Sequence, residues 1–142
     1  MATLSVVIPS YNEIDNIQLL CRACSDIFSN LSDVEVILVD NGSTDQTWDV
    51  INTLKQTHHY DWLKPVRVEH NKGYGYGVLE GLKKASGDIL AWTHADLQTD
   101  PQDILEAKAC FEAHASESIL VKGRRKNRPF LDVFFTAGMQ WY

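Results

Sequence analysis

The chain of 142 residues lacks the features that mark several large classes of protein. No uninterrupted apolar run approaches the roughly 20 residues that a membrane-spanning helix requires, and no charged-then-apolar leader opens the sequence. Basic residues are too few for binding that neutralises many nucleic-acid phosphates, because 13 Lys and Arg face 19 Asp and Glu and the formal net charge is -6. We therefore expect one soluble, cytoplasmic globular domain that does not bind nucleic acid.

Cysteine is also scarce. The odd number of three cysteines argues against a disulfide framework. Cys21 and Cys24 form a C-x-x-C pair, but both fall on the apolar stripe of a predicted helix interior, whereas redox pairs lie at helix N-termini. No second ligand pair stands at the spacing of a zinc site. Core packing is therefore favoured for this pair, with redox or zinc chemistry as the alternative.

Short β-branched runs alternate along the chain with amphipathic segments. The runs that predict strands are Leu4–Pro9, Val34–Val39, Val66–Val68, Ile89–Trp92 and Ile119–Val121. Apolar residues at helical spacing lie between consecutive strands. This alternation predicts an α/β fold with a mostly parallel sheet that helices cover on both faces.

Capping residues and glycines set the expected limits of the helices. Ser43 and Gln46 form a plausible capping box for the second helix, and the third helix is expected to end near Gly87. Asp100 and Pro101 have the residue types of an N-cap and a first helical position, so they are expected to open the fourth helix.

The C-terminal residues depart from this order. Residues 124–128 include three Arg and one Lys, and residues 129–142 are rich in aromatic and aliphatic side chains. One interpretation is a helix that docks on the sheet, and the other is a chain cut inside an element. The ending Trp141-Tyr142 favours the second. We expect a domain of residues 1–128 and, in residues 129–142, the start of a C-terminal element that is cut short.

Polar segments follow four of the predicted strands. In an open parallel sheet, ligands bind beyond the carboxyl ends of the strands, so these segments are the candidate site. They are residues 9–13, 40–45, 71–77 and 94–98. Asp40 could accept a hydrogen bond from a nucleobase N–H and Tyr11 could stack on the base, although an Asp before Asn-Gly is by itself ordinary turn chemistry.

The third segment is rich in glycine but is not a dinucleotide fingerprint. Gly73, Gly75 and Gly77 alternate, and they follow the third strand rather than the first. Two interpretations are equally good: the glycines let a ligand approach the backbone beside helix N-terminal amides, or they form a tight turn.

The fourth segment carries candidate metal ligands. Alternate residues of an extended stretch point the same way, so His94, Asp96 and Gln98 could face one divalent cation. A carboxylate, an imidazole and an amide oxygen suit Mn²⁺ or Mg²⁺ bridged to a diphosphate. The alternative is that Asp96 caps the next turn and His94 is a half-buried histidine with satisfied hydrogen bonds.

Taken together, three of these segments resemble the inverting glycosyltransferases of family 2, most closely the branch of dolichol-phosphate mannose synthase. The segments are Val6–Glu13, Ile37–Asp45 and Ala95–Gln98, and Gly73 to Gly87 agrees in order and spacing. The resemblance runs from Leu4 to about Arg125. It implies the nucleotide-sugar-binding half of the A-type glycosyltransferase fold, a Rossmann-like nucleotide-diphospho-sugar transferase fold.

The resemblance also implies roles for individual residues. The nucleoside is expected at Pro9, Tyr11, Glu13 and Asp40, with Lys72 and Gly73 beside the phosphates. Asp96 matches the second Asp of the D-x-D motif of the family, whereas His94 replaces the first and the neutral Asn41 follows Asp40. Gln98 matches a position that joins the metal shell, and Arg124 or Arg125 matches a basic position that meets phosphate.

The implied activity is the metal-dependent transfer of a sugar, with inversion, from a nucleoside-diphosphate sugar to an acceptor. A polyprenyl phosphate is one candidate acceptor, and its ionised oxygen needs no general base. The alternatives are a non-catalytic nucleotide-sugar-binding module and, with little support, a nicotinamide dehydrogenase, which needs a glycine fingerprint where Pro9–Glu13 stand.

The basic and aromatic C-terminal residues suit approach to an anionic membrane surface at the cytoplasmic face, or a solvated loop before a docking helix. We expect the acceptor side of the fold to be missing from this chain, so that it binds the donor without transferring sugar. Exposed aromatic residues could also drive self-association into a homo-oligomer; they are Phe130, Phe134, Phe135 and Trp141.

Overall fold

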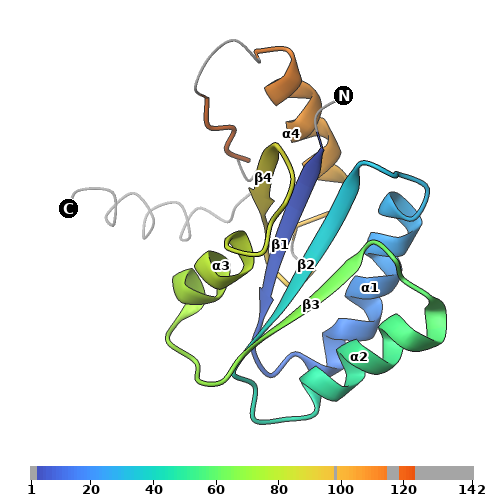
Figure 1. The fold of residues 1–142 in the computed structure, drawn as a ribbon, viewed down its shortest axis with the longest axis vertical. Helices are drawn as coiled ribbons and strands as arrows, with labels where there is room; N and C mark the ends of the chain where they lie inside the picture. The colour runs from blue at the N-terminus through green and yellow to red at the C-terminus, as the bar shows by residue number, and fades with distance from the viewer. Residues whose placement is uncertain (1–2, 98, 115–118, 124–142) are drawn as a thin grey trace, which may run out of the picture.

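Four parallel strands form the sheet in the computed structural model, which describes residues 3–97, 99–114 and 119–123 (Figure 1). The strands are β1 (Leu4–Ser10), β2 (Val34–Asn41), β3 (Leu63–Val68) and β4 (Ile89–Trp92). Their order across the sheet is β3-β2-β1-β4, and every neighbouring pair is parallel. The predicted α/β class with a parallel sheet is confirmed.

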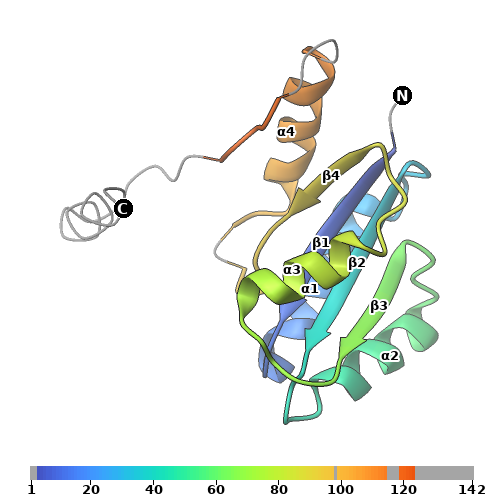
Figure 2. The ribbon, with the colours of Figure 1, turned by 60° about the vertical axis from the view of Figure 1, so that its left-hand side comes forward.

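Helices cover both faces of this sheet, as predicted. They are α1 (Ile14–Phe28), α2 (Thr47–His58), α3 (Tyr74–Leu82) and α4 (Gln102–Glu112). Figure 2 shows α3 on the face opposite α1 and α2. Ile104 of α4 packs into the same core as α1, so α4 belongs to the α1 side of the sheet.

Strand β1 is the centre of the core, because all seven of its residues are buried. Val6 and Ile8 face the larger core beneath α1, whereas Val7 faces the smaller core beneath α3. Burying an aliphatic side chain of this kind contributes roughly 1.5–3 kcal/mol. A strand buried on both faces explains why the first run contains so few polar residues.

The C-x-x-C pair lies in the larger core, which confirms the core-packing interpretation. Cys21 and Cys24 are both buried. Burial raises the pKa of the Cys21 thiol to about 11, and burial together with Cys21 raises that of Cys24 to about 12. Both side chains therefore stay as thiols at neutral pH.

Helix α3 lies unusually close to the sheet. Gly81 is buried, and a β-carbon at this position would collide with the side chains of Val7 and Val39. The glycine therefore permits the helix to rest directly on β1 and β2. This contact holds the C-terminal end of α3 on the sheet.

Two predictions about helix ends are wrong. Helix α2 begins at Thr47, and Ser43 and Gln46 do not form a capping box. The backbone N–H of Thr47 instead donates to Asp45 Oδ1 at 2.9 Å. The Ser43 hydroxyl instead accepts a hydrogen bond from the backbone N–H of Asn12 at 3.0 Å. Helix α3 ends at Leu82, well before Gly87.

The predicted opening of α4 agrees with the structure. Pro101 has helical dihedral angles (φ -56, ψ -23), and Asp100 Oδ1 accepts a hydrogen bond from the backbone N–H of Gln102 at 2.9 Å. The predicted fifth strand at Ile119–Val121 is wrong, because these residues have no strand structure. The predicted domain boundary at residue 128 and the element of residues 129–142 lie outside the described residues.

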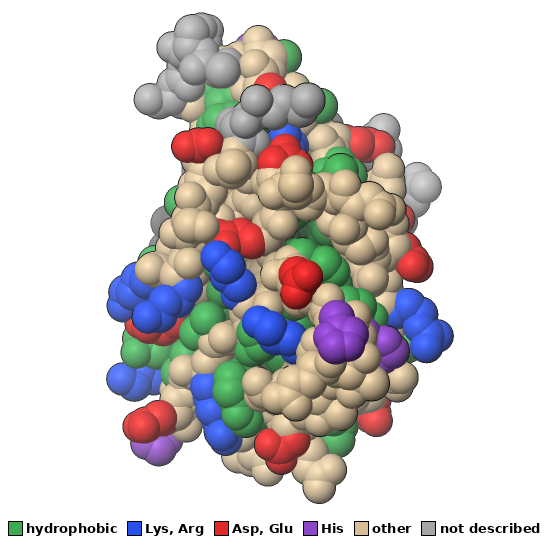
Figure 3. Space-filling view, turned by 45° about the vertical axis from the view of Figure 1, so that its right-hand side comes forward, with side chains coloured by type: hydrophobic (Ala, Val, Ile, Leu, Met, Phe, Trp, Pro, Cys, Tyr) green, Lys and Arg blue, Asp and Glu red, His purple; other side chains and the backbone are tan. Residues whose placement is uncertain are grey.

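None of the helices in the described part of the chain is long and apolar enough to span a membrane. On the face shown in Figure 3, acidic and basic side chains are interspersed. Lys83 and Glu80 at the C-terminal end of α3 form an ion pair 2.6 Å long, and such surface pairs contribute little to stability because water screens them.

Glu35 differs from these surface acids because its side chain is only 13% exposed. It forms an ion pair with Lys64 and accepts hydrogen bonds from the Ser5 hydroxyl and from the backbone N–H of Ser86. Burial alone would raise the pKa of Glu35, but these hydrogen bonds outweigh it and lower the pKa from 4.5 to about 2. The carboxylate thus joins β1, β2 and β3 to the turn before β4.

We predict that Glu35→Gln destabilises the fold at neutral pH by on the order of 2 kcal/mol. Because the folded-state pKa is depressed, this stabilisation is present above about pH 4.5 and is lost as the pH falls towards 2. Urea unfolding from pH 7 to pH 2.5 should therefore show a difference between wild type and variant that shrinks in acid. Glu106→Gln on the exposed side of α4 is the control, and a pH-independent difference for Glu35→Gln would contradict the prediction.

Candidate functional site

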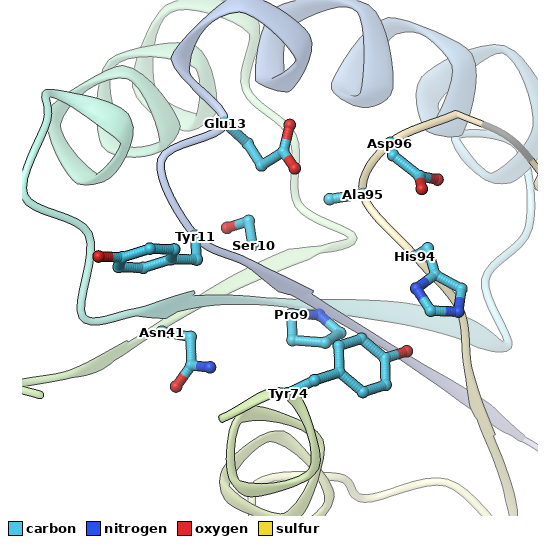
Figure 4. Close-up of a pocket in the computed structure, with 9 residues that line it drawn as sticks. All are labelled: Pro9, Ser10, Tyr11, Glu13, Asn41, Tyr74, His94, Ala95 and Asp96. Atoms are coloured by element: carbon cyan, nitrogen blue, oxygen red, sulfur yellow. The ribbon is translucent and has the colours of Figure 1, made fainter. Parts of the chain in front are cut away.

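A pocket of about 150 Å³ opens beyond the carboxyl ends of the strands (Figure 4). Its lining comes from the ends of β1 and β2, the start of α3 and the segment after β4. The lining residues are Pro9, Ser10, Tyr11, Glu13, Asn41, Tyr74, His94, Ala95 and Asp96. Segments that are far apart in the sequence therefore meet where the parallel sheet predicts a ligand.

The loop after β1 is held by the loop after β2. Asn12 has a left-handed backbone (φ 52), and its Oδ1 accepts a hydrogen bond from the backbone N–H of Thr44 at 2.8 Å. The backbone N–H of Glu13 donates to the Thr47 hydroxyl at 3.0 Å. These bonds fix the segment that carries Tyr11 and Glu13, both of which line the pocket as expected.

Asp40 is fully buried and is not among the residues that line the pocket. Its Oδ1 accepts a hydrogen bond from the backbone N–H of Ser43 at 3.1 Å. Its Oδ2 lies 3.6 Å from Arg67 Nε on the neighbouring strand and has no hydrogen-bond donor in the described part of the chain. Arg67 in turn lies over the Trp48 ring, 5.4 Å from its centroid.

Asn41 joins the pocket to the glycine-rich segment. Its Nδ2 donates to the carbonyl of Gly73 at 3.0 Å, and Gly73 has a φ of 97, which favours glycine. The backbone N–H of Gly77 donates to the same carbonyl at 3.3 Å. Gly77 packs directly on Asn41, because a β-carbon there would lie 2.9 Å from Asn41 Cγ. Gly77 thus serves close packing of α3 against the pocket wall, whereas Gly73 supplies a positive φ.

Lys72 and Gly73, which were expected beside the phosphates, do not line the pocket. Lys72 Nζ instead lies 5.0 Å from the centroid of the Tyr76 ring. Both residues directly precede Tyr74, which does line it. They are therefore neighbours of the pocket rather than part of its wall.

The segment after β4 is a closed loop rather than an extended stretch. The Thr93 and Thr99 hydroxyls are 2.8 Å apart and hydrogen bonded, and Leu97 has a left-handed backbone (φ 57). The stretch is therefore not extended at Leu97, and the direction of Gln98 lies outside the described residues. His94 and Asp96 nevertheless both line the pocket, whereas Gln98, Arg124 and Arg125 lie outside the described residues.

Tyr74 was not singled out by sequence reasoning, yet it contacts His94. The two rings stack with centroids 4.8 Å apart and planes inclined by 15° (Figure 4). Burial and the nearby charge of Asp96 raise the pKa of the Tyr74 phenol. In the sequence, Tyr74 is only an aromatic residue within a glycine-rich segment, and the fold brings it against His94.

The carboxylates of Glu13 and Asp96 give the pocket its acidic character. Glu13 Oε2 accepts a hydrogen bond from Asn16 Nδ2 at 2.7 Å. Within residues 3–97, 99–114 and 119–123, no cluster of three or more His, Cys, Asp or Glu side chains could hold a metal ion. The chemistry of Asp96 and His94 fits Mn²⁺ or Mg²⁺ if diphosphate oxygens and water complete the coordination, as is usual for these ions.

A family model named glycosyl transferase family 2 matches residues 5–132 of the chain. The chain belongs to this family. A dolichol-phosphate mannosyltransferase of Pyrococcus furiosus is 33% identical over 139 residues, which are 95% of this chain and 38% of that protein. A dodecaprenyl-phosphate galacturonate synthase of Rhizobium johnstonii is 35% identical over 127 residues, 88% of this chain and 36% of that protein.

Solved structures of the same kind share the fold. The mannosyltransferase PcManGT of Pyrobaculum calidifontis, in complex with GDP-Man and Mn²⁺, has a TM-score of 0.66 and 27% identity, covering 73% of this chain and 30% of its own. TarS of S. aureus, in complex with UDP-GlcNAc, has a TM-score of 0.68 and 26% identity, covering 89% of this chain and 37% of its own. The predicted A-type glycosyltransferase fold is confirmed. The chain spans between 30% and 38% of the length of these four proteins.

We predict that Gly77→Ala weakens the fold by about 1–3 kcal/mol, the cost of overpacking. The new β-carbon would meet Asn41, whose side chain is buried and held by Gly73. Gly75→Ala is the matched control on the same helix, because nothing lies within 4 Å of a β-carbon there. It should be neutral or stabilising by up to about 1 kcal/mol. Equal urea midpoints for the two variants would show that Asn41 and α3 are not tightly packed.

Proposed function

We propose that the pocket binds a nucleoside-diphosphate sugar and that the full protein transfers the sugar to an acceptor with inversion. The observation that carries this proposal is the convergence of Tyr11, Glu13, His94 and Asp96 on one pocket. Membership of glycosyl transferase family 2 supports it, as do the nucleotide-sugar complexes of the two structural neighbours. Within the chain, residues 1–128 would form the donor-binding domain.

The nucleoside would lie against the part of the pocket that β1 and β2 build. Tyr11 is 44% exposed, so its ring is free to stack on a base, and Pro9 adjoins it on the floor of the pocket. The base N–H groups would meet Asp40, whose Oδ2 is the buried oxygen without a donor in the described residues. A small movement of Arg67 or Asn41 has to accompany that contact, because Asp40 is fully buried.

The diphosphate would lie between the segment after β4 and the start of α3. Asp96, with His94 and Gln98, would hold Mn²⁺ or Mg²⁺, and Lys72, Gly73, Arg124 and Arg125 would add positive charge and backbone donors. A bound divalent cation offsets the charge that develops on the departing diphosphate. Because Asn41 and His94 are not acidic residues, the pocket carries less negative charge than it would with carboxylates at these positions, which favours an anionic ligand.

The acceptor would be a polyprenyl phosphate, the substrate class in the names of the two curated relatives. An ionised phosphate oxygen attacks without a general base, which agrees with a reaction that depends on orientation and leaving-group stabilisation. Such an acceptor would place the full protein at a membrane surface, and we propose that this is the cytoplasmic face. The basic and aromatic residues 124–142 suit that surface by their composition, and their aromatic side chains would favour homo-oligomers.

We predict that Asp96→Ala abolishes the Mn²⁺ dependence of nucleoside diphosphate binding and leaves the fold intact, because the variant removes a carboxylate from the open pocket. By calorimetric titration with GDP and UDP, Mn²⁺ should tighten binding by wild type about tenfold, which is about 1.4 kcal/mol. The same cation should change binding by the variant less than about twofold.

Asp26→Ala is the matched control, because Asp26 is exposed on α1 and does not line the pocket. It should keep the full effect of Mn²⁺. The metal assignment is wrong if Asp96→Ala binds the nucleotide with unchanged affinity and unchanged Mn²⁺ dependence.

A further inference from the structure

The Tyr74 side chain of helix α3 contacts the segment after β4. The Tyr74 ring stacks on the His94 ring with centroids 4.8 Å apart, and the Tyr74 hydroxyl donates a long hydrogen bond of 3.4 Å to the carbonyl of Thr93. Tyr74 therefore contacts two consecutive residues of the loop that carries Asp96. Both rings also form part of the pocket wall.

The start of α3, which carries Tyr74, is fixed by hydrogen bonds and close packing, so the Tyr74 ring can fix the orientation of a neighbouring ring. Tyr74 is the first residue of α3, directly after Gly73, whose carbonyl accepts hydrogen bonds from Asn41 Nδ2 and from the backbone N–H of Gly77. The close packing of Gly77 on Asn41 fixes the same end of the helix. The aromatic ring consequently projects from an anchored helix terminus.

The His94 side chain is exposed, and the ring contact that its imidazole makes with the described part of the chain is the stack with Tyr74. Histidines that ligate metals usually donate their second ring N–H to a carboxylate or a carbonyl, and this bond sets the orientation of the ring. Here the described contact that can set it is the stack with Tyr74. Stacking covers the face of the imidazole and leaves both ring nitrogens at its edge.

We propose that Tyr74 is a positioning residue that orients His94, so that a ring nitrogen of His94 reaches the divalent cation held by Asp96. The proposal rests on the proposed function, because it concerns the metal of the same donor site. It assigns the role to the ring of Tyr74 rather than to its hydroxyl, whose hydrogen bond to Thr93 is long.

The test is pulsed electron paramagnetic resonance of Mn²⁺ bound to the protein with GDP or UDP, which detects a ¹⁴N nucleus coordinated to the ion. Wild type should show ¹⁴N coupling, and His94→Gln should lose it. Tyr74→Phe keeps the ring and should keep the coupling, whereas Tyr74→Leu should lose it. Tyr74→Leu should also lower the affinity for Mn²⁺ about tenfold, which is the lower end of the range for residues that orient metal ligands.

Leu79→Ala controls for a general effect on α3, because Leu79 is exposed on that helix and does not line the pocket. It should leave the ¹⁴N coupling and the Mn²⁺ affinity as in wild type. If Tyr74 only stabilises the fold, Tyr74→Leu should lower the melting temperature without changing the ¹⁴N coupling.

Three outcomes distinguish the proposed role of Tyr74 from the proposed function of the pocket. Loss of coupling in Tyr74→Leu with retention in Tyr74→Phe supports the proposal. Mn²⁺-dependent nucleotide binding by wild type without ¹⁴N coupling, or with coupling that survives in Tyr74→Leu, overturns it and leaves the proposed function standing. Absence of any Mn²⁺-dependent nucleotide binding by wild type overturns the proposed function, and this proposal with it.

Discussion

The parallel pairing of β1 with both β2 and β4 is the constraint on which the rest of the structure depends. Seven register pairs join β1 to β2 and four join it to β4, and parallel strands end on the same side of a sheet. The segments after these strands, which lie more than 80 residues apart at Ser10 and His94, therefore meet at one edge. The pocket is a consequence of this register and needs no dedicated scaffold.

Short side chains then determine how closely the surrounding elements approach that edge. Gly81 lets α3 rest on Val7 and Val39, and Gly77 lets it rest on Asn41. On the other side, Asn12 ties the first loop to the second. A larger residue at either glycine would have to move the helix, and with it the aromatic wall of the pocket. The contacts that pack α3 on the sheet therefore also set the shape of the pocket.

Much of this arrangement is predictable from the sequence, since alternating apolar runs and helical periodicity identify the four strands and the placement of the pocket. The errors come from effects that are not local. Ser43 caps no helix, because its hydroxyl accepts a hydrogen bond from the backbone N–H of Asn12, which is 31 residues away. The loop of His94 and Asp96 bends where an extended stretch was expected, because Leu97 adopts a left-handed backbone. The stack of Tyr74 on His94 has no sequence signal, since neither residue belongs to a motif that pairs them.

We have proposed that a nucleoside diphosphate and a divalent cation occupy the pocket at the ends of β1 and β4. Backbone amide resonances of the isotope-labelled chain, titrated with GDP or UDP in Mg²⁺ and then with a trace of Mn²⁺, test it most directly. We expect chemical-shift changes confined to the pocket-lining residues and their neighbours, and paramagnetic broadening that is strongest at Asp96 and His94. Broadening centred elsewhere, or shifts that avoid Tyr11, Glu13 and Asn41, would contradict it.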